Sequence, residues 1–224
     1  MALAVSDSPA VAASKLHARR KRTLELLKSD FVFFCHALWS VMGYDKVAPI
    51  GPAEEQMMRW IAGVGGAPTR RGVLAPRSIG KTHIVLAYVA FRLNKKAELK
   101  VLVVSKTELH AKDSIRLLRG WFNHVAWLHH LKPNRGLGHR DHALYLDVGD
   151  SKPRHRTPSL TAAGIDGQLE GKRAGLTIVD DVETDSNTQS IDMRQKLDTR
   201  VRELARVTTY EPRNIVYVGT FHHD

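Results

Sequence analysis

Residues 75–82 carry the side chains with the clearest chemical potential in this sequence. They read Ala-Pro-Arg-Ser-Ile-Gly-Lys-Thr, which matches the phosphate-loop pattern Gly-x-x-x-x-Gly-Lys-Ser/Thr with Ala75 in place of the first glycine. In such a loop Gly80 lets the backbone approach phosphate, Lys81 neutralises the outer phosphates, and Thr82 offers a hydroxyl to a magnesium ion. Apolar residues on both sides place the loop between a strand and a helix, so the pattern predicts a nucleotide site rather than an ordinary helix start.

Two acids directly follow a second apolar run. Asp180 and Asp181 come after Leu-Thr-Ile-Val, and Glu183 lies two residues further on. A carboxylate at a strand end beside a phosphate loop can hold magnesium through water, and a second acid can orient or deprotonate the attacking water. We assign metal binding to Asp180. The acid that activates the water is either Asp181 or Glu183, with Asp181 favoured. Paired acids also occur in ordinary turns and helix caps, so this prediction depends on the loop and the acids occurring together.

Strands that alternate with helices must position these groups. We predict strands at 73–74, 100–105, 144–147, 159–163, 176–179 and 214–219, and helices at 14–27, 31–42, 53–62, 84–93, 107–122 and 191–207. The all-apolar run at 101–104 is typical of a strand buried on both faces, and hence of a parallel sheet. We therefore predict an α/β fold, a P-loop NTPase of the additional-strand type, with a mainly parallel sheet flanked by helices. About one hundred residues separate Lys81 from Asp180, which leaves room for a strand between the two.

The chain divides into three parts. Residues 1–13 are small and rich in Ala, Ser and Pro and are predicted to form a disordered tail. Residues 14–62 form an N-terminal helical segment, and residues 63–224 form the P-loop core. Within that core, residues 164–175 are too glycine-rich for a regular element and too charged to be buried, so we expect a mobile loop there. We also expect Lys81 to be exposed.

Composition limits the partners. The 224 residues carry 34 Lys and Arg against 23 Asp and Glu, a net charge of +11, which predicts an anionic partner without separating DNA from RNA or an acidic membrane. No apolar run approaches the length of a membrane span, so we expect no membrane partner. The single cysteine, Cys35, excludes an internal disulfide and favours a reducing, cytoplasmic compartment.

Four segments, in this order, resemble the large terminase subunit of short-tailed bacteriophages, the ATP-driven motor that packages DNA into the procapsid. They are residues 75–82, 164–174, 178–183 and 218–221, and the resemblance extends from about Gln56 to the end of the sequence. It implies an ATPase domain that binds ATP and Mg²⁺, with Gln56 at the adenine and Arg77 reaching the γ-phosphate. Thr220 would belong to a coupling turn that senses that phosphate. The remaining phosphate-loop residues would be Ala75, Pro76, Ser78, Gly80, Lys81 and Thr82.

The resemblance also implies partners and limits. Double-stranded DNA would be the substrate of a homo-oligomeric ring on the procapsid portal in the host cytoplasm, with a small terminase subunit as a further partner. The family usually has a carboxyl-terminal nuclease domain, and this sequence stops at Asp224, so we expect no nuclease activity from this segment. Asp181 stands where such motors commonly have glutamate, which keeps Glu183 open as the residue that activates water.

Two alternatives to a packaging motor remain open. One is a helicase-like, nucleic-acid-dependent ATPase, although the sequence has no residues for a second ATPase-like lobe. The other is a basic DNA-binding module whose nucleotide site is degenerate, with Ala75 as the sign of decay. Arg173 has two interpretations as well: an arginine finger that enters a neighbouring subunit of a ring, or a residue that only caps its loop or binds DNA.

Overall fold

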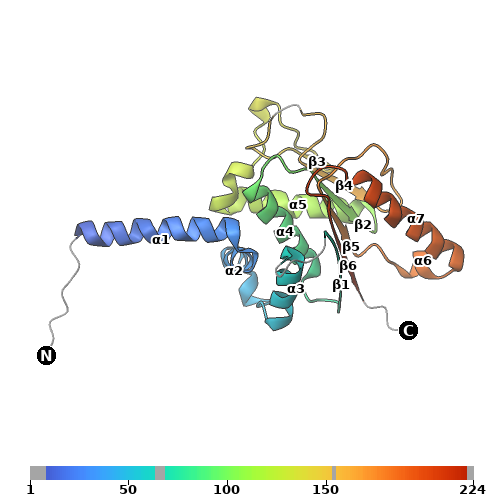
Figure 1. The fold of residues 1–224 in the computed structure, drawn as a ribbon, viewed down its shortest axis with the longest axis horizontal. Helices are drawn as coiled ribbons and strands as arrows, with labels where there is room; N and C mark the ends of the chain where they lie inside the picture. The colour runs from blue at the N-terminus through green and yellow to red at the C-terminus, as the bar shows by residue number, and fades with distance from the viewer. Residues whose placement is uncertain (1–8, 64–68, 153–154, 221–224) are drawn as a thin grey trace.

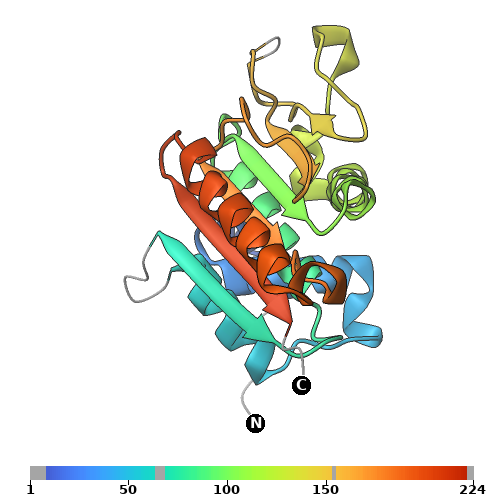
Figure 2. The same cartoon turned by 90° about the vertical axis from the view of Figure 1, so that its right-hand side faces the viewer.

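A six-stranded sheet in the order β1-β6-β5-β2-β4-β3 runs through the molecule (Figure 1, Figure 2). The computed structural model describes residues 9–63, 69–152 and 155–220, with side chains from residue 14 onward except at 185 and 186. All strand pairs are parallel except the one between β3 and β4, which confirms the predicted α/β class. The strands are β1 (Arg70–Ala75), β2 (Val101–Ser105), β3 (Tyr145–Leu146), β4 (Leu160–Gly164), β5 (Leu176–Asp180) and β6 (Asn214–Thr220).

The strand between β1 and β5 is β6, which comes last in the sequence. The predicted intervening strand is therefore present, but it does not come from the residues that separate the phosphate loop from the acids. Ala75 pairs with Thr220 across β1 and β6, and Asp180 pairs with Val218 across β5 and β6. Because these strands are parallel, their carboxyl ends meet at one edge of the sheet.

Two of the helices have the bounds that the sequence predicts, because their caps are local. The Asp30 carboxylate accepts a hydrogen bond from the Phe33 backbone N–H at the start of α2, and Ser190 caps α7 through the Met193 N–H. The helices are α1 (Pro9–Ser29), α2 (Phe31–Met42), α3 (Pro52–Ala62), α4 (Lys81–Lys95), α5 (Glu108–His124), α6 (Asp185–Thr188) and α7 (Ile191–Val207), and short 3-10 turns lie at Tyr44–Lys46, Ala126–Leu131 and Arg135–Leu137.

Helix α1 begins five residues before the expected position 14. Residues 9–13 belong to α1, whereas the rest of the expected tail, residues 1–8, lies outside the described part. A proline is tolerated in the first turn of a helix and alanine is the best helix former, which explains the earlier start. The helix extends away from the body of the molecule (Figure 1), and its side chains from residue 14 to 25 are exposed.

The core has two halves, one on each face of the sheet. On one face α2, α3, α4 and α5 cover alternate residues of the strands, and on the other face α7 lies across the sheet (Figure 2). In β2, Val101 and Val103 belong to the first half and Leu102 and Val104 to the second, as expected for a strand buried on both sides. None of the helices among the described residues is long and apolar enough to cross a bilayer.

The glycine-rich segment at 164–175 is not excluded from the core. Ile165, Leu169 and Ala174 are fully buried in the half of the core beneath α7. The Ala174 N–H also donates to the Val207 carbonyl (3.0 Å), which anchors the end of the segment. The expectation of a segment too charged to be buried is therefore wrong for its apolar residues, which face inward, whereas its charged residues stay outside the core. Residues 166–168 and 170–173 remain outside the buried part.

Candidate functional site

The phosphate loop has the backbone that anion binding requires. It joins β1 to α4, and Gly80 adopts a left-handed φ of 73° directly before the first residue of α4. A Cβ built on Gly80 would meet no atom within 4 Å, so the glycine is needed for its backbone conformation and not for space. Ser78 also has a positive φ (68°), which is strained for a residue with a side chain. The loop therefore turns sharply onto the amino terminus of α4, whose free N–H groups attract an anion.

Lys81 is folded back over this loop and is not exposed as expected. Its side chain is only 8% exposed, and Nζ donates to the carbonyls of Ala75 (3.1 Å) and Pro76 (2.8 Å). The sequence could not show this, because the two carbonyls come into reach only through the turn of the loop. The ammonium is thus held close to the helix terminus by two neutral carbonyl acceptors, which leave its charge available to a phosphate.

Asp180 lies at the end of β5, in the interior of the sheet, and is 6% exposed. Burial raises the pKa of its carboxyl to about 6, and Asp181 adds to the rise. A hydrogen bond from the Thr82 hydroxyl and the charges of Lys81 and Lys106 oppose it. The Oδ1 atom of Asp180 has no hydrogen-bond partner among the described residues. Asp180 and Thr82 could therefore hold a magnesium ion, because both offer hard oxygen ligands and one carboxylate oxygen of Asp180 is unpaired among the described residues.

The two other acids are both bound by hydroxyl groups of β6. Thr220 Oγ1 donates to Asp181 Oδ1 (2.7 Å), and the hydroxyl of Tyr217 donates to Glu183 Oε1 (2.7 Å). Burial and the neighbouring Glu183 carboxylate raise the pKa of Tyr217, so this phenol stays a donor. Asp181 has a positive φ of 50°, and its N–H donates to the Val218 carbonyl (2.8 Å). Strand β6 thus fixes the backbone and side chain of Asp181 beside Asp180.

Two cavities flank the loop. A cavity of about 270 Å³ is lined by Thr82, Lys106, Asp180 and Asp181, but not by Glu183. A second cavity, of about 590 Å³, is lined by Gln56 and Trp60 of α3 together with residues of β1 and the loop. The indole N–H of Trp60 donates to the Gly72 carbonyl (3.1 Å), which fixes the ring as a wall. The apolar wall and the amide group suit a planar base, and the smaller cavity, with its hydroxyl, ammonium and carboxylate groups, suits phosphate and metal.

Neither of the two predicted arginines is brought to these cavities. Arg77 and Arg173 are exposed and line neither of them. Lys172, beside Arg173, is partly buried, and this burial lowers the pKa of its ammonium although Glu108 lies near enough to oppose the shift. The described chain therefore leaves both arginines free to approach a ligand or a neighbouring molecule.

Several residues that line the smaller cavity were not predicted from the sequence, among them Ser105 at the end of β2, Lys106 directly after it, His83 on α4 and His110 on α5. The rule that ligands bind at the carboxyl ends of parallel strands would have found Ser105 and Lys106, because β2 itself was predicted. Nothing in the sequence indicates His83. Its ring is surrounded by aromatic side chains at centroid distances of 5.3 to 6.4 Å, and burial lowers its pKa, which favours the neutral ring.

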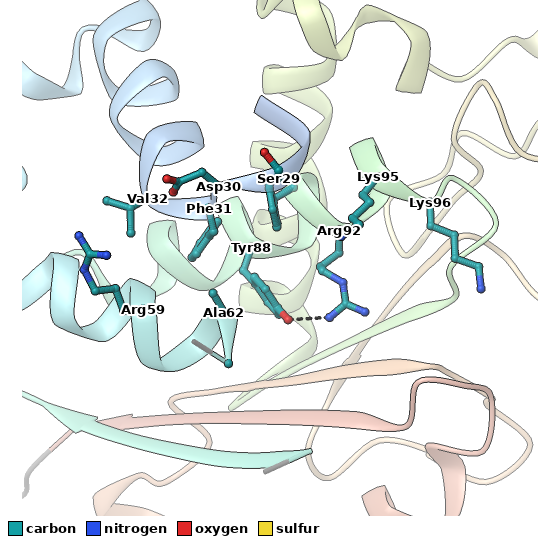
Figure 3. A pocket seen from close by; sticks show the side chains of 12 residues that line it. Ser29, Asp30, Phe31, Val32, Arg59, Ala62, Tyr88, Arg92, Lys95 and Lys96 are labelled. Carbon is teal, nitrogen blue, oxygen red and sulfur yellow. Dashed lines mark hydrogen bonds between the residues drawn. The ribbon is translucent and has the colours of Figure 1, made fainter. Parts of the chain in front are cut away.

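A further cavity, of about 710 Å³, lies elsewhere. It is lined by the junction of α1 and α2, by the end of α3, and by the carboxyl-terminal half of α4 (Figure 3). Figure 3 shows Arg92 turned toward Tyr88, whose hydroxyl accepts a hydrogen bond from Nη1 (2.6 Å). Helix α4 has 15 residues, which is about 22 Å at 1.5 Å per residue, so this cavity is separate from the phosphate loop.

The strand order and the site together define a P-loop NTPase fold of the additional-strand type. No family model matches the chain. The chain is 34% identical over 195 residues to the large terminase subunit of Enterobacteria phage T3, a match that covers 87% of this chain and 32% of that protein. The predicted resemblance to large terminase subunits is thereby confirmed, and the chain spans about a third of the length of the curated relative it matches.

Solved structures overlap with the chain only in part. The large terminase of bacteriophage HK97 has a TM-score of 0.49 at 9% identity, covering 76% of this chain and 33% of that one. Dbp5 of S. cerevisiae has a TM-score of 0.48 at 10% identity, covering 84% and 47%. The ATPase domain of the Thermus phage P74-26 large terminase has a TM-score of 0.40 at 12% identity, covering 81% and 70%. The fold class therefore rests on the strand order and register of the sheet itself.

The buried carboxyl of Asp180 predicts a dependence of stability on pH. Its pKa rises from 3.8 to about 6 on folding, so the folded state favours the neutral form and is penalised once the carboxyl ionises. In protein free of nucleotide and metal, we expect Asp180→Asn to raise the free energy of unfolding at pH 8 by up to about 3 kcal/mol. The gain should shrink as the pH falls through 6 and vanish near 4.

Urea unfolding from pH 8 to pH 4.5 in the presence of a chelator measures this gain. The exposed Asp150→Asn is the matched control and should show no comparable gain. A gain for Asp180→Asn that is absent at pH 8, or that grows toward low pH, would contradict the buried, uncompensated charge.

Proposed function

We propose that this chain is the ATP-hydrolysing motor segment of a large terminase subunit, which drives double-stranded viral DNA into a procapsid. The observation that carries the proposal is the convergence of the phosphate loop with Asp180 and Asp181 at one edge of a parallel sheet. The sequence match to a large terminase subunit supports it independently. The net charge of +11 suits a polyanionic substrate.

ATP is held on both sides of the phosphate loop in this proposal. The cavity with Gln56 and Trp60 takes the adenine, and the loop amides with Lys81 take the phosphates. Ala75, Pro76, Ser78 and Gly80 shape the loop. Thr82 and Asp180 hold Mg²⁺, which neutralises charge on the transferring phosphoryl group. The unpaired oxygen of Asp180 and the adjacent Thr82 hydroxyl fit this ion.

Asp181 is the residue we propose to orient and deprotonate the attacking water. It lines the cavity that also contains Asp180, whereas Glu183 does not, and Glu183 is already bound by Tyr217. The Thr220 hydroxyl donates to Asp181, so any change at the γ-phosphate that moves Asp181 also reaches the end of β6. This contact supports Thr220 as the residue that passes the loss of phosphate to the DNA-gripping parts.

The subunits act as a homo-oligomeric ring on the procapsid portal in the host cytoplasm, with a small terminase subunit as a further partner. Arg77 reaches the γ-phosphate from within its own loop. Arg173 enters the site of the neighbouring subunit as an arginine finger, and its exposure next to the anchored Ala174 supports this role because the side chain projects from a fixed base.

Replacing the loop lysine tests the ATPase. We expect Lys81→Ala to reduce turnover at saturating ATP and Mg²⁺ by about 100-fold or more, because it removes charge stabilisation from the transition state. Lys95→Ala is the matched control, since Lys95 is an exposed lysine at the far end of the same helix. Both proteins should keep the circular dichroism spectrum of the unaltered chain. A folded Lys81→Ala protein with unchanged turnover would remove the loop from the mechanism.

Hydrolysis with and without double-stranded DNA at low salt separates the motor from its alternatives. A packaging motor should be stimulated by duplex DNA. A helicase-like ATPase should respond to single strands instead, and a binding module with a degenerate site would bind DNA without turnover.

Replacing each of the two candidate bases with its amide shows which one activates water. We expect Asp181→Asn to lower kcat by about 100-fold at unchanged nucleotide affinity, as for loss of a general base, and Glu183→Gln to lower it far less. Single-turnover hydrolysis together with binding of a fluorescent ADP measures both quantities. A silent Asp181→Asn with an inactive Glu183→Gln would reverse the assignment.

Mixing tests whether Arg173 acts between subunits. Arg173→Ala and Lys81→Ala proteins should each be inactive alone, whereas a mixed ring pairs an intact loop in one subunit with an intact finger from the next. We expect mixtures to regain hydrolysis in proportion to such pairs, and the specific activity of the unaltered chain to rise with protein concentration. Co-assembled mixtures without recovery would show that Arg173 acts in its own subunit, caps its loop or binds DNA.

A further inference from the structure

Two buried polar atoms without a partner lie at neighbouring strand ends. Ser105 is the last residue of β2, Asp180 is the last residue of β5, and the two are paired across this parallel ladder. Ser105 is 2% exposed and Asp180 is 6% exposed. Among the described residues neither Ser105 Oγ nor Asp180 Oδ1 has a hydrogen-bond partner.

Such atoms are expected to have a hydrogen-bond partner. A buried polar group left unpaired destabilises a protein, and most are satisfied by protein or by bound solvent. Neighbouring strands lie about 4.8 Å apart, so a serine hydroxyl beside a carboxylate could bond it directly, yet these two atoms do not. Both residues line the cavity of about 270 Å³, together with Thr82 and Lys106. The cavity offers polar groups from these residues and is large enough for several water molecules.

A second serine of the same cavity provides a contrast. Ser114 on α5 is 4% exposed, and its hydroxyl donates to the His110 carbonyl (3.1 Å) one turn earlier in the helix. This hydroxyl is satisfied by the fold itself. The Ser105 hydroxyl is not, although both residues are buried against the same space. The difference indicates that the Ser105 hydroxyl is available to bind a molecule that enters the cavity.

We propose that Ser105 is a positioning residue for the magnesium site: its hydroxyl binds a water molecule of the hydration shell of the ion beside Asp180. The inference rests on the proposed function, because that function places Mg²⁺ at Asp180 and Thr82. Magnesium gives up its water reluctantly and is held largely through that water, so a group that orients a shell water contributes to affinity. Outer-shell partners of this kind typically change metal affinity 10- to 100-fold.

The test is Ser105→Ala, read by binding and not by turnover. Fluorescent ADP is titrated with Mg²⁺ to give the ion concentration for half-maximal binding, and urea unfolding is measured with a chelator and without nucleotide. We expect Ser105→Ala to need about tenfold more Mg²⁺. Its unfolding midpoint without metal should be unchanged or higher, because an unpaired buried group has been removed. A structural serine would show the opposite: a lower midpoint and unchanged Mg²⁺ dependence.

Two further variants complete the design. Ser105→Thr keeps the hydroxyl and should restore most of the Mg²⁺ affinity. Ser114→Ala is the matched control and should lower the unfolding midpoint without changing the Mg²⁺ dependence. Unaltered Mg²⁺ affinity in Ser105→Ala, or no recovery in a folded Ser105→Thr, would overturn the inference alone. An unaltered chain that shows no Mg²⁺-dependent nucleotide binding would overturn the proposed function, and the inference with it.

Discussion

The burial of the Asp180 carboxylate is the constraint on which the rest of the site depends. A carboxylate at an interior strand end is costly unless partners offset its charge, and here they come from three elements. Thr82 and Lys81 reach it from the start of α4, and Lys106 from the end of β2. The compensation is incomplete, since the pKa stays raised to about 6. The site is therefore built with a deficit of positive charge that a divalent cation would remove.

The sheet holds this arrangement because β5 lies between β2 and β6. Its position fixes Ser105 on one side of Asp180 and Val218 on the other. Strand β6 contributes more than backbone, since Thr220 bonds the acid that follows Asp180. Short-range hydrogen bonds thus connect the last strand to the acids, two of which line the smaller cavity. A displacement of one of these parts therefore moves the others.

Much of the fold could be predicted because its signals are local. The α2 and α7 helices have the predicted bounds since Asp30 and Ser190 cap them within three residues. The loop and acid motifs fix residue types and, with parallel strands, their common edge. Long-range facts could not be predicted: the insertion of β6 beside β1, the inward apolar residues of the glycine-rich segment, and the return of Lys81 to two loop carbonyls. Each depends on a contact that no nearby residue specifies. The roles assigned to individual site residues stay predictions.

Strand β6 also sets the order in which the molecule can assemble. Within the described residues β1 joins the sheet only through β6. Ala75 therefore has no strand partner until Thr220, 145 positions later, is in place. Such distant pairing slows folding, and it leaves the edges of β1 and β5 open in the meantime. On the ribosome the phosphate loop would therefore emerge long before the strand that brings it to the acids. A nascent chain can then hold no complete nucleotide site until synthesis has passed β6, which couples the onset of nucleotide binding to completion of the sheet.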